Sequence, residues 1–90
     1  MTRPELENAA ATLQDAAESA SDDETRDRLE NQAQQFETLA EADRGPDHGK
    51  LARHEHVLTE IADDEGGAVA NLVTEALESI SAYRETVDGV

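Results

Sequence analysis

The stretch "DRGPDHGKLARHEH", residues 43–56, gathers most of the side chains of this chain that could bind a ligand. It holds all three histidines, the only lysine and three of the seven basic residues. Ammonium and guanidinium groups bind anions, and a neutral imidazole binds metal ions. A candidate ligand-binding or interface cluster is therefore expected at this stretch, made of Asp43, Arg44, Asp47, His48, Lys50, Arg53 and His54.

The spacing of the histidines argues against a metal site within one chain. Ligands on one helix share a face when they are three or four positions apart, but His48, His54 and His56 are separated by six and two positions. The patterns H-E-x-x-H and Glu-x-x-His do not occur. No metal and no cofactor are expected, although a site shared across a dimer axis stays open.

Two interpretations of the basic cluster remain. A helix that begins near Asp47, with Arg44, Lys50 and Arg53 close by, has the chemistry of a phosphate or anion site. The same side chains could instead cap and pair the two helix ends that meet at this hinge. The second interpretation is the simpler one, because charged residues at helix ends have this role in most proteins.

His54 and His56 are expected to have different surroundings. At 100° per residue, His54 falls in the middle of an apolar stripe, so it is expected as a hydrogen-bonded core or interface residue. Its partner would be Lys50, Tyr83 or a backbone carbonyl. His56 lies on the opposite side and is expected to be exposed.

Motifs of other chemistries are missing from the chain. There is no cysteine, no P-loop, no G-x-G-x-x-G, no G-x-S-x-G and no EF-hand loop. Nucleic-acid binding is disfavoured by the net charge and by the shortage of aromatic side chains, which are Phe36 and Tyr83 alone. The protein is therefore expected not to be an enzyme.

The charge is strongly acidic, with 22 acidic against 7 basic residues and a net charge of −15. At molar salt the Debye length falls to about 3 Å, so self-repulsion fades. This composition predicts a halophilic, cytoplasmic protein. An acidic mimic that occupies a basic surface is an alternative, although the charge is spread along the chain. No run has the length of a signal peptide core or of a membrane span, so no membrane partner is expected.

Four helices are predicted from start and stop signals. Thr2 to Glu5 fits a capping box that starts the first helix, and Ser21 to Glu24 fits a second box that starts a helix over 23–43. A continuous helix over 2–43 is the alternative. Gly45 and Pro46 end this first hairpin.

The second hairpin covers 47–87. Its first helix is expected over 47–62 and is ended by "DDEGG", because two consecutive glycines disfavour a helix. Its second helix carries the strongest apolar stripe of the chain. The apolar or core-facing positions of the last three predicted helices are Leu29, Ala33, Phe36, Leu39 and Ala40, then Leu51, His54, Leu58 and Ile61, then Val69, Leu72, Val73, Ala76, Leu77, Ile80, Tyr83 and Val87.

Short connections between helices predict an all-α fold, a small antiparallel bundle of two hairpins in a single domain over 1–90, with a hinge at 44–47. Eighteen large apolar residues in a chain of 90 make a marginal core for a monomer. A homodimer is therefore expected, sharing the apolar stripes of the second and fourth helices between chains. Its interface stripe would be Leu72, Leu77, Ile80 and Tyr83, unless these stripes close within one chain.

The segment "DRGPDHGKLARH", together with the acidic alanine-rich hairpin before it and "AYRETVDGV" at 82–90, resembles a family of small acidic haloarchaeal proteins. The family has no assigned activity, so the resemblance implies a helical fold and a halophilic origin but transfers no catalytic residue. The expected function is a non-enzymatic helical interaction or oligomerisation module. The alternative is a small anion-binding protein with its site at residues 43–54.

Overall fold

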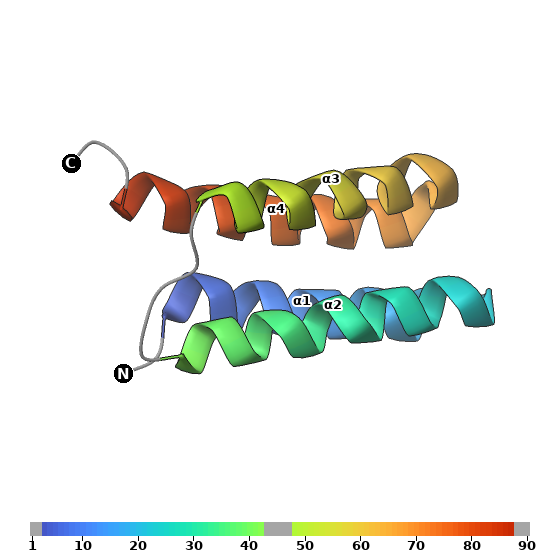
Figure 1. Cartoon of the computed structure of the whole chain (residues 1–90). Coiled ribbons are helices and arrows are strands. Elements are labelled where there is room, and N and C mark those ends of the chain that lie inside the picture. Colours follow the sequence, from blue (N-terminus) through green and yellow to red (C-terminus); the bar gives the residue numbers. More distant parts are fainter. Residues whose placement is uncertain (1–2, 43–47, 88–90) are drawn as a thin grey trace.

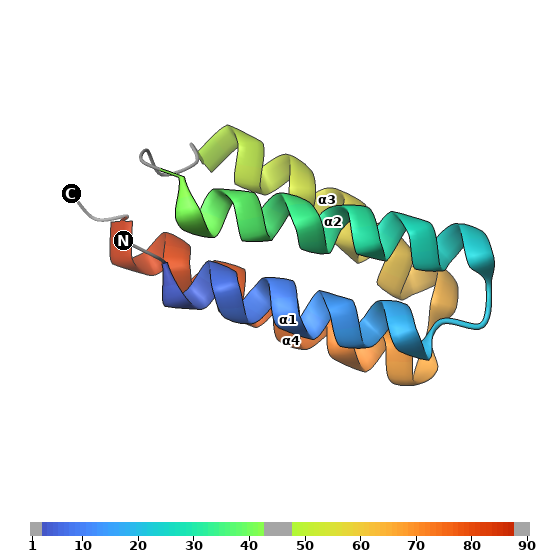
Figure 2. The ribbon, with the colours of Figure 1, turned by 90° about the horizontal axis from the view of Figure 1, so that it is seen from below.

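A computed structural model describes residues 3–42 and 48–87 of the chain. Four helices follow one another: α1 (Pro4–Ser19), α2 (Asp23–Glu41), α3 (His48–Glu65) and α4 (Gly67–Val87). They alternate in direction, so α1 begins, α2 ends, α3 begins and α4 ends at the same end of the bundle (Figure 1). One layer holds α1 and α2 and the other holds α3 and α4, with α1 over α4 and α2 over α3 (Figure 2). The predicted antiparallel helical bundle of two hairpins is confirmed.

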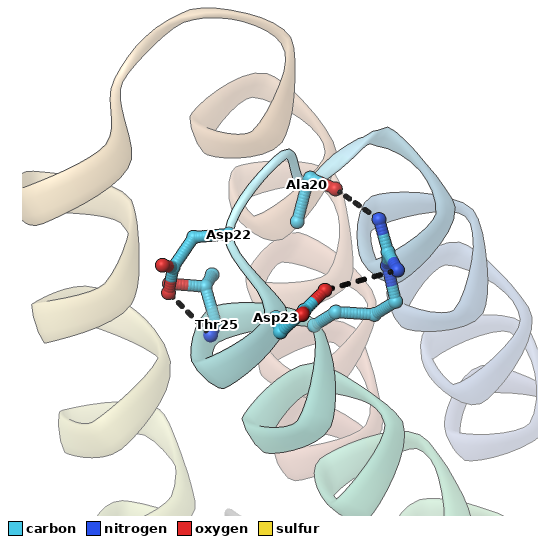
Figure 3. Close-up of polar contacts among 5 residues, drawn as sticks. Ala20, Asp22, Asp23 and Thr25 are labelled. Carbon is cyan, nitrogen blue, oxygen red and sulfur yellow. Dashed lines mark hydrogen bonds and ion pairs between the residues drawn. The ribbon is translucent and has the colours of Figure 1, made fainter.

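The predicted capping boxes differ from the observed helix starts. The N-cap of α2 is Asp22, whose carboxylate accepts a hydrogen bond from the backbone N–H of Thr25 at 2.9 Å (Figure 3). Asp22 replaces the predicted Ser21 because a carboxylate also favours the positive end of the helix dipole. The N-cap of α1 is Arg3, without a side-chain cap, and Thr2 lies outside the described residues. The predicted box at Thr2 is therefore wrong in its capping position.

Two arginines bind the carboxyl ends of the helices of the first hairpin. The Arg26 guanidinium donates to the carbonyl of Ala20 at 2.9 Å, just after α1, and also contacts Asp23 (Figure 3). At the opposite end, the Arg3 side chain donates to the carbonyls of Leu39 and Ala42 at 3.1 and 2.7 Å. Neither helix has a basic residue in its own last turn. The neighbouring helix thus supplies the positive charge that a helix carboxyl end favours.

The helix α3 is longer than predicted, because Asp63, Asp64 and Glu65 belong to it. The prediction ended this helix at Ala62 and was wrong at that end. The glycines alone make the turn: Gly66 and Gly67 have φ of 64° and 57°, which favours glycine over residues with a Cβ. Acidic residues tolerate the helical conformation, so the chain leaves the helix only at the glycines.

The predicted apolar stripes form the core. Residues 20–22 interrupt the first hairpin, so the alternative of one continuous helix over 2–43 is wrong. The predicted stripes of α2 and α3 are buried throughout, and His54 is buried among them with 8% exposure. The apolar core consists of Leu6, Ala9, Ala10, Leu13, Ala16, Ala17, Ala20, Leu29, Ala33, Phe36, Leu39, Ala40, Leu51, Leu58, Ile61, Val69, Val73, Ala76, Ile80 and Tyr83.

The helices pack against one another unequally. The helix α1 packs along both α2 and α4, and α3 packs along α4, while the backbones of α2 and α3 hardly approach each other. We call the two contacts of α1 the alanine seams, because its buried residues are Leu6, Leu13 and four alanines. We call the α2–α3 contact the polar seam, because Thr25, Gln32 and His54 are its buried polar residues.

Candidate functional site

The residues of the predicted basic cluster point in different directions. Asp43, Arg44 and Asp47 lie outside the described residues. Among the others, His48 lies on the α4 side of α3, whereas Lys50 lies beside α2. Arg53 is exposed and His54 is buried. The described part of the cluster therefore forms two separate groups and not a single pocket.

The first group joins α3 to α4. The Arg84 guanidinium donates from Nε to His48 Nδ1 at 3.2 Å and from Nη1 to the Glu55 carboxylate. The Glu55 and Arg84 side chains are 22% and 30% exposed, so this ion pair is partly shielded from solvent. His48 and Glu55 are seven positions apart, which places them on one helix face. Sequence reasoning missed both Glu55 and Arg84, although this spacing was a usable signal.

The second group lies in the polar seam around His54. Its Nδ1 is 2.8 Å from Gln32 Oε1, and its ring meets Phe36 edge-on with 5.2 Å between ring centroids. An amide oxygen only accepts hydrogen bonds, so the neutral ring carries its proton on Nδ1 and donates to Gln32. None of the expected partners of His54 is the observed one. Gln32 sits on an otherwise apolar face of α2, so its polarity was the available signal.

Burial makes His54 harder to protonate. Desolvation, and then the charges of Lys50 and Arg53, lower the pKa of its imidazole below the usual 6.5. The ring therefore stays neutral near pH 7 and keeps its bond to Gln32. His56, in contrast, is exposed as predicted, with its Nε2 3.5 Å from the Glu60 carboxylate.

A groove opens at the outer edge of the polar seam, near the start of α3. Its volume is about 250 Å³. One wall is Lys50 and the rest comes from α2. That helix contributes the exposed amide and hydroxyl side chains of Asn31, Gln34, Gln35 and Thr38, and the largely buried Leu39. The groove is thus lined by one cation and by neutral polar groups, in a chain whose surface is mainly acidic.

The four residues of the predicted interface stripe on α4 do not share one environment. Ile80 and Tyr83 are buried in the core of the single chain, with 0% and 6% exposure. Leu72 and Leu77 are half-buried against that core. Five positions correspond to 140° on a helix, so these two leucines flank the core stripe on opposite sides. The apolar stripes of α2 and α4 therefore pack into the core of a single chain.

Among the described residues there is neither a metal-binding cluster nor a membrane-spanning helix. Over 3–42 and 48–87, no group of three or more histidine, cysteine or acidic side chains is arranged to hold a metal ion. Within the same ranges, every helix is too short or too polar to cross a membrane.

The fold defines a small up-down four-helix bundle with a net charge of −15. The chain belongs to DUF7553, a family of unknown function, whose model matches residues 1–86. A search of curated proteins found no match, and neither did a search of solved structures.

Proposed function

We propose that the protein is a non-enzymatic helical module that self-associates in a cytoplasm of high salt concentration. In the described structure, the titratable side chains that contact one another join helices, which supports a structural role for these side chains. Arg84 donates to both His48 and Glu55 between α3 and α4, and His54 binds Gln32 inside the bundle. These groups hold helices together, and none of them faces the groove.

The observation that carries this proposal is the incomplete enclosure of α3. Four of its 18 residues are buried, and five of the residues 67–86 of α4, against six of 16 in α1 and seven of 19 in α2. Since α3 packs along α4 and hardly approaches α2, one flank of it is left to solvent. A second chain that covers this flank would bury it, as helices in larger bundles do.

High salt is part of the proposal because of the charge. Two copies that each carry −15 repel each other over long distances in dilute buffer. At molar salt the Debye length is about 3 Å, so only side chains in contact still interact strongly. Self-association is therefore expected to strengthen with salt. The acidic composition and the resemblance to haloarchaeal proteins support such a setting.

The experiment is the molar mass in solution, by size exclusion with light scattering in about 2–3 M KCl, where the screening is strong. The expected mass is twice that of the 9.7 kDa chain. A mass of one chain at every protein concentration and salt concentration would refute the proposal. Circular dichroism of the same samples verifies that the chain is folded.

The groove supports a second candidate function, the binding of a small anion beside Lys50. Amide and hydroxyl donors around one ammonium group suit a phosphate or carboxylate. Inorganic phosphate is the probe, followed by NMR shifts of the side-chain amides of Asn31, Gln34 and Gln35. Saturable shifts that Lys50→Met abolishes would support this function. Shifts that are the same in both proteins would reject it.

A further inference from the structure

One exposed stripe of α3 carries its charges in a symmetrical order. Lys50, Arg53, Val57, Glu60 and Asp64 are three or four positions apart, so they follow one line along the helix. Two basic residues precede Val57 and two acidic residues follow it. The charge of the line therefore reverses at Val57, from positive near the start of α3 to negative near its end.

This line lies on the α2 side of α3, at the rim of the polar seam. Lys50 belongs to the groove wall formed with α2, and Val57 is half-buried against the core. The four charged residues of the line are exposed. Glu60 also contacts the exposed His56 on its own helix. The line is thus accessible to another molecule along its whole length, with an apolar residue at its centre.

The charge of this line changes sign at its centre. When two such lines lie antiparallel, each positive residue therefore faces a negative residue of the other copy. We propose that α3 packs antiparallel against α3 of a second copy, about a two-fold axis that passes Val57. Lys50 then lies opposite Asp64 of the second copy, and Arg53 lies opposite Glu60. Each pair occurs twice, because a two-fold interface uses the same residues on both chains.

The neighbouring flank of α2 is compatible with this arrangement. Beside Lys50, α2 presents Asn31, Gln34, Gln35 and Thr38, which are uncharged. At the Lys50 end of the line, this flank therefore adds no charge that would oppose the pairing of Lys50 with Asp64 of the second copy. By contrast, the parallel arrangement of two α3 helices would place each charge opposite an equal charge. Charge complementarity therefore selects the antiparallel partner.

The inference rests on the proposed self-association and specifies its surface. The first test reverses charges in pairs. Arg53→Glu alone, or Glu60→Arg alone, puts like charges opposite each other twice per dimer and is expected to weaken dimerisation about tenfold. The double variant Arg53→Glu with Glu60→Arg restores both pairs with opposite signs. It should dimerise within about twofold of the wild type, because it also restores the net charge.

The second test uses the absence of cysteine from the chain. Val57→Cys places one thiol beside the two-fold axis, where the Cα atoms of two copies are about 6 Å apart if a disulfide forms. Oxidation should link two chains rapidly. The matched control is Ala52→Cys, which is exposed on another face of α3 and should cross-link slowly.

The outcomes separate the two proposals. Restoration by the double variant together with fast cross-linking at residue 57 is the expected result. The wild type could instead form a dimer while the double variant dimerises as weakly as the single variants. That result would refute the α3 interface but not self-association. A wild-type chain that stays monomeric at all salt concentrations would overturn both.

Discussion

The contacts that α1 makes with its neighbours differ in kind from the contact between α2 and α3. In the alanine seams, small side chains such as Ala9 and Ala16, both fully buried, let the backbones approach closely. In the polar seam, the longer side chains of Gln32 and His54 bridge two backbones that hardly approach. The first contact is continuous along the helices, whereas the second depends on a few polar pairs.

The difference shows how a chain with few large apolar residues builds a core. Alanines add little buried area each, but they let helices approach closely, and the leucines of α1 are fully buried. The polar seam gains less from packing. Its stability depends on satisfying Gln32, His54 and Thr25, since a buried polar group without a partner costs free energy. The polar seam also leaves the groove and the α3 line accessible.

The largest expected effect comes from enlarging a residue of an alanine seam. Ala16→Leu should lower the free energy of unfolding by about 3 kcal/mol, because Ala16 is fully buried and added carbons would overpack the core. The control is Ala11→Leu on the exposed side of the same helix, which should change it by less than about 0.5 kcal/mol. Urea unfolding at fixed KCl measures both. Equal effects would show that the alanine seams are not tightly packed.

In the polar seam, removing one partner should matter more than removing both. Gln32→Ala leaves the Nδ1–H of His54 buried without an acceptor and should lower the free energy of unfolding by about 2 kcal/mol. Replacing Gln32 and His54 together by leucine should be nearly neutral, because no polar group is left unpaired. The same urea unfolding tests this. A double variant less stable than Gln32→Ala would contradict the assigned role of the pair.

A smaller effect is expected at the carboxyl end of α2. Arg3→Ala removes the donor to the carbonyls of Leu39 and Ala42 and should lower the free energy of unfolding by about 1 kcal/mol. Arg28→Ala is the matched control, because Arg28 is exposed on α2. Thermal unfolding of the two variants gives the comparison. A loss at Arg28 as large as at Arg3 would argue for a general charge effect.

The smallest expected effect is a dependence of stability on pH. Because the pKa of His54 is lowered in the folded state, the unfolded chain binds more protons as the pH falls through 6.5. The stability contributed by the neutral ring is thus complete above pH 6.5 and declines below it, until the folded pKa is reached. Unfolding curves between pH 7.5 and 5 measure this decline. His54→Leu should flatten that part of the profile, and an unchanged profile would exclude His54 as its source.

Much of the fold follows from local patterns. The three- and four-residue spacing of Leu51, His54 and Leu58 predicted a buried face, and the structure confirms it. The exposure of His56 followed from the same geometry. Helix ends were less predictable, because two capping signals overlapped at Ser21 and Asp22, and because only the glycines ended α3.

The partners of the candidate site residues were not predictable in the same way. His54 binds Gln32, 22 positions away, and Arg84 binds His48, 36 positions away. Such pairs depend on which helices become neighbours and how far apart their axes lie. Arg3 illustrates the same point, since nothing near it in the chain indicates that it binds the end of α2.

By itself, the sequence determined where the helices form, which faces are apolar and how the charges are ordered along α3, because these properties repeat with the 3.6-residue turn of one helix. The tertiary structure decided that the basic stretch of α3 contacts two different helices, α4 through His48 and α2 through Lys50. It also decided that the apolar stripes of α2 and α4 pack within one chain. Those outcomes depend on the distances between helices. These distances depend on the side-chain sizes at all helix contacts, and therefore on residues from the whole chain.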